Sequence, residues 1–246
     1  MNNSIAVQLY TLHSECEKDF YGTLEKVSEL GFNGVELAGY WGKEAENLKL
    51  TLDRLGLKAV SSHVSLENLE NNLDAELAYL KILDCKNIVC PYLFENQRDD
   101  YYNLASRLNK IGEKCQQEGI SLSYHNHDFE LEKSEGKTYL DILFAETNPE
   151  FVKAELDVYW LTFAGEDPLQ WLEKYSNRLP LIHLKDMTTD EEKTFAELGT
   201  GGVDIKAIVE KCKLENVEWF IIEQDKCKRS PFESIEQSIK YLKTIL

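Results

Sequence analysis

Short apolar segments recur along this chain at a mean spacing of about thirty residues, the length of one strand–helix unit. Each segment has the length and composition of a buried strand, and helical patterns separate consecutive segments. We expect strands at residues 5–9, 34–37, 57–61, 87–91, 120–125, 152–157, 179–183 and 217–223. Strands that alternate with helices favour a parallel sheet. Eight such units in 246 residues predict a single (β/α)8 TIM barrel, a fold of about 250 residues.

The competing arrangement is an open, doubly wound sheet, which also alternates strands with helices. A dinucleotide-binding fold of that kind carries Gly-x-Gly-x-x-Gly after its first strand. Here residues 8–11 read QLYT at that position, which is polar and aromatic. Because the chain has eight units and lacks that fingerprint, we expect one barrel domain over residues 1–246.

The composition of the chain limits the kinds of molecule to which the protein could bind. The formal net charge of −17 opposes binding to nucleic acid or to an anionic membrane, since either would require a basic face. No apolar run approaches the roughly 18 residues of a membrane span. The six cysteines form no CxxC pair, and no charged-then-apolar leader precedes the first strand. We expect a soluble cytoplasmic protein that acts on a small molecule, and a homo-oligomer remains open.

Histidine and carboxylate side chains follow the expected strands at their downstream ends. In a parallel barrel these ends converge on one mouth, so residues far apart in sequence meet there. The candidates are Tyr10, Glu36, His63, His125, His127, Asp157, His183 and Glu223. Imidazole and carboxylate ligands suit one Mn, Zn, Co or Fe ion better than Ca, and Mg is a poorer match. His125 and His127 share a strand, so spacing does not decide which of them is the ligand.

Several longer segments resemble a known family. They are YHNHDFE at 124–130, ELDVYW at 155–160, HLKDM at 183–187, ELGTGGVD at 197–204 and IIEQD at 221–225, with further similarity at 8–11 and 34–37. Together they resemble the sugar phosphate isomerase/epimerase branch of the xylose isomerase-like TIM barrels. The resemblance covers essentially the whole chain.

The resemblance implies a metal site with a departure at strand five. Members of that superfamily hold a divalent ion with Glu, Asp, His and Glu at the ends of strands five to eight, which implies Asp157, His183 and Glu223 as ligands here. His125 stands where a carboxylate is usual. In ketose epimerases that glutamate is also one of two proton-transferring groups, so its replacement brings elimination into consideration beside epimerisation.

We therefore expect a metal-dependent sugar isomerase or epimerase that works through an enediolate. His125 or His127 is the expected base, Glu223 acts from the opposite side, and Lys185 donates to a developing oxyanion or leaving group. Substrate contacts are expected from Tyr10, Glu36, His63 and Trp160.

Other functions remain in competition. The same apparatus supports a lyase that dehydrates a keto-inositol or cleaves a keto-glycoside by β-elimination. A non-catalytic binding barrel is the second alternative. A glycoside hydrolase that uses Glu155 and Glu223 would leave the histidines unexplained, and the acidic charge opposes a barrel endonuclease. Whether the glycine cluster at 199–202 binds a substrate phosphate is open, because it lacks the Gly-Lys-Ser/Thr of a P-loop.

Overall fold

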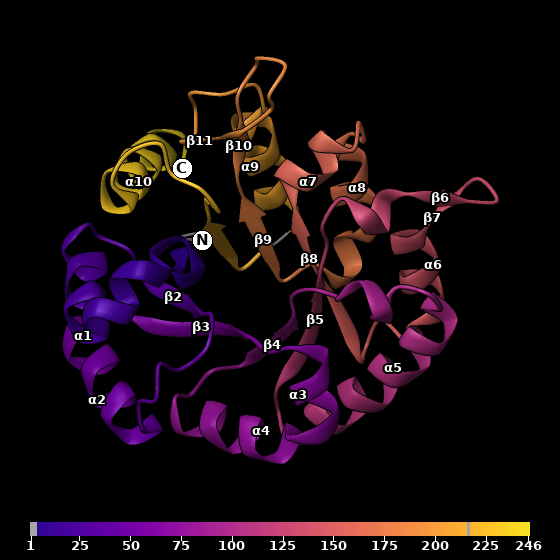
Figure 1. The fold of residues 1–246 in the computed structure, drawn as a ribbon, viewed down its shortest axis with the longest axis horizontal. Helices are drawn as coiled ribbons and strands as arrows, with labels where there is room; N and C mark the ends of the chain where they lie inside the picture. The colour runs from indigo at the N-terminus through magenta and orange to yellow at the C-terminus, as the bar shows by residue number, and fades with distance from the viewer. Residues whose placement is uncertain (1–3, 216) are drawn as a thin grey trace.

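The structure is a computed structural model that describes residues 4–215 and 217–246. Within them, eight parallel strands close into a barrel in the order β1-β12-β9-β8-β5-β4-β3-β2, and helices surround it (Figure 1). The barrel strands are β1 (Ser4–Gln8), β2 (Gly34–Leu37), β3 (Lys58–His63), β4 (Asn87–Cys90), β5 (Ser121–His125), β8 (Val152–Asp157), β9 (Leu181–Leu184) and β12 (Trp219–Ile222). The predicted TIM barrel is confirmed. The expected absence of a leader falls on residues 1–3, outside the described residues.

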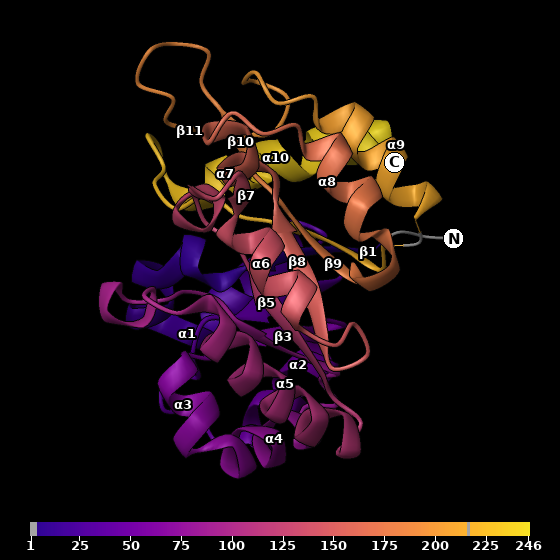
Figure 2. The ribbon, with the colours of Figure 1, turned by 90° about the vertical axis from the view of Figure 1, so that its right-hand side faces the viewer.

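The remaining elements connect the strands. The helices are α1 (His13–Glu29), α2 (Ala45–Leu55), α3 (Leu66–Asn71), α4 (Leu73–Ile82), α5 (Tyr101–Gln117), α6 (Tyr139–Glu146), α7 (Val158–Phe163), α8 (Pro168–Tyr175), α9 (Ile205–Leu214) and α10 (Pro231–Ile245). Short 3-10 turns are η1 (Leu9–Leu12), η2 (Glu95–Gln97), η3 (Phe129–Leu131) and η4 (Ser176–Arg178). Two small hairpins pair β6 (Lys133–Ser134) with β7 (Lys137–Thr138), and β10 (Asp186–Met187) with β11 (Phe195–Ala196). The second hairpin lies beyond one end of the barrel (Figure 2).

Strand boundaries differ from the sequence prediction by one or two residues at most ends. The third strand continues to His63, so this histidine closes the strand instead of following it. None of the described helices is long and apolar enough to cross a membrane.

The barrel interior has an apolar layer beneath a polar one. The apolar layer is a small cluster, separate from the main core between strands and helices, made of Ala6, Val60, Val89, Leu181 and Ile221. Alternate residues of a strand share a face. Two residues further along β1, β9 and β12 therefore stand Gln8, His183 and Glu223, all of them buried.

Close packing against α5 holds β8 in position. Gly112, in the middle of α5, faces the backbone of Phe151 immediately before β8, and a Cβ at Gly112 would overlap the Phe151 carbonyl oxygen. The buried guanidinium of Arg178 donates from Nε to the Val152 carbonyl at 3.0 Å. These two contacts fix the start of the strand that carries Glu155 and Asp157.

We predict that Gly112→Ala lowers the free energy of unfolding. Overpacking against a backbone that is held in place destabilises a protein by about 1–3 kcal/mol. This cost exceeds the stabilisation of about 1 kcal/mol that alanine gives over glycine inside a helix. Urea denaturation measures the difference. The neighbouring Glu113→Ala is the control, since Glu113 is exposed and should change stability by less than about 0.5 kcal/mol. A Gly112→Ala protein as stable as the wild type would contradict this account of β8.

Candidate metal centre

Four of the expected residues meet at the carboxyl ends of β5, β8, β9 and β12. His125, Asp157, His183 and Glu223 are all buried, and each offers a ligand atom within 4.8 Å of the others. We call these four residues the outer set. The set is assembled from residues up to one hundred positions apart because parallel strands deliver their ends to one mouth.

Two further carboxylates, Glu36 and Glu155, lie beside the outer set, and we call them the inner carboxylates. Glu155 Oε2 lies 3.0 Å from His63 Nε2, 3.1 Å from His125 Nδ1 and 3.4 Å from His183 Nε2. Glu36 Oε2 lies 2.6 Å from His183 Nε2 and 3.1 Å from His63 Nε2. Three imidazoles therefore surround two carboxylates inside the barrel.

His125 and His183 each connect the outer set to an inner carboxylate. His183 directs Nδ1 to Glu223 Oε2 at 2.9 Å and Nε2 to Glu36. His125 directs Nε2 to Asp157 Oδ2 at 3.6 Å and Nδ1 to Glu155. A metal-binding histidine usually donates its second ring nitrogen to a carboxylate, which fixes the orientation of the ring. Both imidazoles have that environment here.

The ammonium group of Lys185 lies among the carboxylates of the site. Its Nζ is 2.9 Å from Asp157 Oδ2, 2.6 Å from Glu223 Oε2 and 2.8 Å from Asp225 Oδ1. Burial disfavours the charged amine, but the three carboxylates outweigh burial and raise the pKa of Lys185 well above its usual value. The same lysine and His183 lower the pKa of Glu223 despite its burial. Lys185 is therefore a buried cation and Glu223 a buried anion.

The residues present fit a divalent cation. Asp157 Oδ1 accepts from the Tyr159 amide at 2.9 Å and so caps α7. Its Oδ2 is buried beside the Lys185 ammonium at 2.9 Å, whereas Glu155 Oε1 is buried and accepts no hydrogen bond from the described residues. Buried carboxylate oxygens without a donor are costly unless a cation lies near them. The site as a whole holds five carboxyl groups and only one lysine, and two imidazoles complete a set of ligands suited to Mn, Zn, Co or Fe.

His127 differs from His125 although the two are separated by one residue. Among the described residues it belongs neither to the outer set nor to a second metal-capable group made of His63, His125, Glu155 and His183. Its ring centroid lies 5.1 Å from that of His125. Its Nδ1 is buried and has no hydrogen-bond partner among residues 4–215 and 217–246. Burial, and then the positive charge of Lys185, lower the pKa of His127 to about 3. The imidazole is therefore neutral at physiological pH.

The four expected substrate contacts fall into two kinds. Glu36 and His63 lie inside the barrel against protein partners, with Glu36 accepting from Gln8 Nε2 at 2.7 Å. Tyr10, in η1, is half exposed. Trp160, in α7, lies with its ring centroid 5.9 Å from Lys185 Nζ, and its indole N–H is buried without a partner.

Sequence reasoning missed four residues that support the site. Ser61 donates to Glu36 Oε1 at 2.5 Å, Gln8 donates to the other oxygen, and Asp225 binds Lys185. Glu130 is buried and accepts from Tyr124 Oη at 2.7 Å and from the His127 amide at 2.8 Å. Glu130 is the last residue of the YHNHDFE segment, so the family resemblance of that segment was the one signal in the sequence that pointed to it.

The glycine-rich loop at 199–202 is occupied by a protein carboxylate. Asp186 Oδ2 accepts from the amides of Gly199 and Gly201 at 2.9 and 3.0 Å, and its Oδ1 accepts from Val203 at 3.0 Å. These backbone donors already bind an anionic group that belongs to the chain. The loop is thus a turn organised around Asp186.

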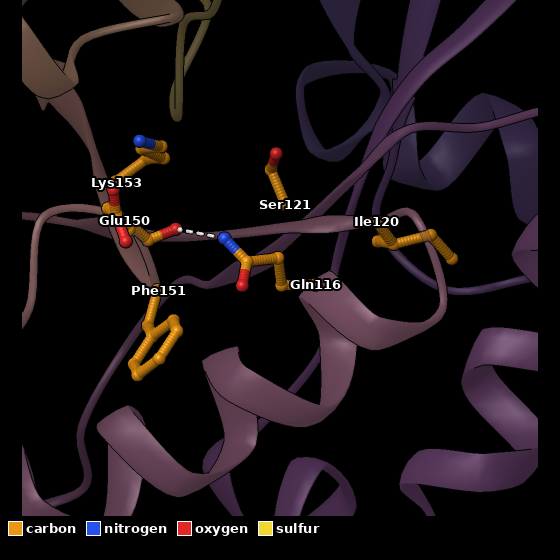
Figure 3. Close-up of a pocket in the computed structure, with 6 residues that line it drawn as sticks. All are labelled: Gln116, Ile120, Ser121, Glu150, Phe151 and Lys153. Carbon is orange, nitrogen blue, oxygen red and sulfur yellow. Dashed lines mark hydrogen bonds between the residues drawn. The ribbon is translucent and has the colours of Figure 1, made fainter.

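A surface pocket of about 350 Å³ lies at the other end of the barrel. Its lining includes Ser121, the first residue of β5, and Lys153, the second residue of β8. Figure 3 shows Gln116 donating to the Glu150 carbonyl at 3.4 Å within it. None of its lining residues belongs to the outer set or the inner carboxylates, so the chemistry of the mouth is separate from this pocket.

The known proteins that this chain is similar to include enzymes that act on sugars and related polyols. The chain is 26% identical to an inosose dehydratase of Clostridium beijerinckii over an alignment of 269 positions. That alignment covers 92% of this chain and 90% of the relative. An inosose dehydratase of Lacticaseibacillus casei is also 26% identical, with 92% and 89% covered. A crystal structure of a sugar phosphate isomerase/epimerase from Parabacteroides distasonis superposes with a TM-score of 0.84 at 26% identity, covering 98% of this chain and 94% of that one.

The family model that describes xylose isomerase-like TIM barrels matches residues 24–245. This match spans most of the chain and includes every residue of the outer set. Together with the closed eight-stranded barrel, it confirms the resemblance found in the sequence. The chain belongs to the xylose isomerase-like TIM barrel family.

Proposed function

We propose that this protein is a metal-dependent lyase that removes a proton next to the ketone of a cyclic polyol or sugar and expels the oxygen substituent one carbon further on. The observation that carries the proposal is an unequal pair of groups at the mouth. His127 is a neutral imidazole with an unpartnered nitrogen, and Lys185 is a buried ammonium. Elimination needs one proton acceptor and one proton donor.

The outer set would hold the metal ion, and the inner carboxylates would hold its two imidazoles in orientation. A divalent ion bound there would polarise the ketone and stabilise the negative charge that develops when the neighbouring proton leaves. Asp157 contributes a rigid oxygen because its other oxygen caps α7. Lys185 would limit the excess negative charge of the five carboxyl groups.

His127 would accept the proton, and Lys185 would supply one to the departing oxygen. The pKa of His127 is low because the ring is buried beside Lys185. Negative charge that develops on the substrate would offset both effects and make the imidazole a stronger base during the reaction. His125 is less suited to this role, since both of its nitrogens face carboxylates.

The sequence-based expectation of an isomerase or epimerase is the second candidate, and the similarity to the Parabacteroides distasonis protein favours it. Epimerisation needs two groups of similar basicity on opposite faces of the reacting carbon. Glu223, the expected second group, binds both His183 and Lys185, which hold its pKa below the usual range. The curated relatives that are inosose dehydratases support elimination.

Incubation with an inosose, a keto-inositol, separates the two candidates. Elimination produces a conjugated or 1,2-dicarbonyl product with new ultraviolet absorbance, whereas epimerisation gives a stereoisomer that retains the oxygen. We expect loss of one water, detected by mass spectrometry. Conversion to a stereoisomer, with deuterium incorporated from heavy water and no loss of mass, would overturn the lyase proposal in favour of the epimerase.

Two glutamine substitutions are predicted to distinguish the role of His125 from that of His127. His125→Gln should lose bound metal, because it removes a ligand of the outer set. His127→Gln should keep the metal and lower kcat by about 10²–10⁴-fold, the usual contribution of a general base. Elemental analysis and steady-state kinetics on both variants make the comparison. Metal loss from His127→Gln, or unchanged kcat, would contradict the assignment of His127 as the base.

Removing the metal should destabilise the fold. Without a cation, the carboxyl groups of the outer set and the inner carboxylates repel one another. A ligand at one hundred times its dissociation constant adds about 2.7 kcal/mol, which corresponds to about 5–10 °C in Tm for a domain of this size. We expect chelation to lower Tm by that amount and added Mn to restore it. An unchanged Tm would instead favour a barrel that binds no metal.

A further inference from the structure

His127, the proposed base, lies beyond the end of its strand. β5 ends at His125, and its pairing with β8 ends there as well. In the described part of the chain, no backbone carbonyl accepts a hydrogen bond from the His127 amide. This amide donates instead to Oε2 of Glu130 at 2.8 Å. A backbone donor that is withdrawn from water needs a partner, and for His127 a carboxyl group replaces the neighbouring strand.

The carboxyl group of Glu130 is itself anchored on β5. Its Oε1 accepts a hydrogen bond from Tyr124 Oη at 2.7 Å, and both side chains are fully buried. Neighbouring residues of a strand point to opposite faces, and Tyr124 belongs to the main core between strands and helices. Glu130 therefore connects the outer face of β5 with the backbone of a residue beyond the strand.

The imidazole ring of His127 has a separate support. Its centroid lies 5.0 Å from that of Tyr92, 5.8 Å from that of Phe129 and 5.3 Å from that of Trp160. Arg98 holds two of these rings, because its Nη2 donates to Tyr92 Oη at 2.8 Å and its guanidinium carbon lies 3.5 Å from the Phe129 centroid. The aromatic neighbours restrict rotation of the imidazole, whereas Glu130 fixes the backbone that carries it.

A buried carboxyl group at this position is costly. Burial raises the pKa of Glu130 to about 7, which shows that the surroundings disfavour its charged form. An apolar side chain of similar volume would avoid that cost, but it would leave the His127 amide and Tyr124 Oη without an acceptor. Glu130 belongs to neither group of metal-capable side chains in the described residues. The value of the carboxyl group therefore lies in its two acceptor oxygens.

We propose that Glu130 is a positioning residue, whose carboxyl group places the backbone of His127 and thereby the imidazole beside the metal centre. The inference rests on the lyase proposal for the role of His127. It concerns where the imidazole lies and not its charge. Glu130 itself has no contact with the reacting atoms, so its effect on the reaction passes through His127.

Two substitutions of similar volume separate the acceptor oxygens from the rest of the side chain. Glu130→Met removes both acceptors without leaving a large cavity. Glu130→Gln keeps both partners, because its amide oxygen accepts from the His127 amide and its amide nitrogen donates to Tyr124 Oη, which accepts as well as donates. Positioning therefore survives in the glutamine variant, whereas a proton relay through Glu130 would not.

Steady-state kinetics on the metal-loaded variants provide the first readout. A displacement of about 1 Å in a catalytic group lowers a rate by about 100-fold, so we expect that loss of kcat in Glu130→Met, with bound metal unchanged. Glu130→Gln should stay within about threefold of the wild type. Glu132→Ala is the matched control, since Glu132 is exposed, and should keep the wild-type kcat. Equal losses in the methionine and glutamine variants would overturn the inference.

A double variant shows whether Glu130 acts through His127. In the His127→Gln background, Glu130→Met should lower kcat no further, because the group that Glu130 positions is already absent. A second loss of about 100-fold in that background would overturn the inference. Tyr124→Phe keeps the carboxyl group and removes its anchor, so it should lower kcat by up to about tenfold, the value of one hydrogen bond. This variant also keeps the inference testable if Glu130→Met does not fold.

Crystal structures of the variants separate this inference from the lyase proposal, because they need no substrate. We expect the His127 imidazole to be displaced in Glu130→Met and Tyr124→Phe and to keep its place in Glu130→Gln. An imidazole that has not moved in the first two variants would overturn the inference even if inosose is dehydrated. A displaced imidazole with wild-type kcat would uphold the placement of His127 by Glu130 and reject His127 as the base.

Discussion

Two imidazoles with carboxylates on both sides organise the interior of this barrel. His183 lies between Glu223 and Glu36, and His125 lies between Asp157 and Glu155. Each ring therefore has one nitrogen directed at the outer set and the other held by an inner carboxylate. Because both inner carboxylates are buried in the barrel, and Gln8 and Ser61 donate to Glu36, the ring orientations are fixed by the fold itself. A metal ion bound at the outer set would meet ligands that are already aligned.

The charges of the site also give its two other polar groups, Lys185 and His127, different protonation states. Concentrated negative charge keeps Lys185 protonated, and Lys185 together with burial keeps His127 neutral. The barrel therefore supplies a donor and an acceptor side by side without further adjustment. The proposed elimination uses this inequality, whereas epimerisation would need two comparable bases on opposite sides of one carbon.

The fold and the location of the site were predictable from local sequence patterns. Eight apolar segments, six of them with His or a carboxylate at the downstream end, were sufficient, because parallel strands bring their ends together whatever the conformation of the loops. The supporting contacts were not predictable. Gln8 and Ser61 meet Glu36 through the register of the two neighbouring strands, which shifts between Val35 and Glu36, and an apolar pattern does not give that register. The sequence also cannot show which of two nearby histidines faces the carboxylates. β5 ends at His125, so strand alternation no longer governs the direction of His127.

Anomalous diffraction from crystals grown with Mn tests the central claim most directly, because it places the ion among the side chains without any assumption about substrate. The account predicts one strong peak within bonding distance of His125, Asp157, His183 and Glu223, with the second nitrogen of each imidazole still on Glu155 or Glu36. A peak bound instead by His63 and Glu155, or no peak at the mouth at saturating Mn, would contradict the account and remove the basis for the proposed chemistry.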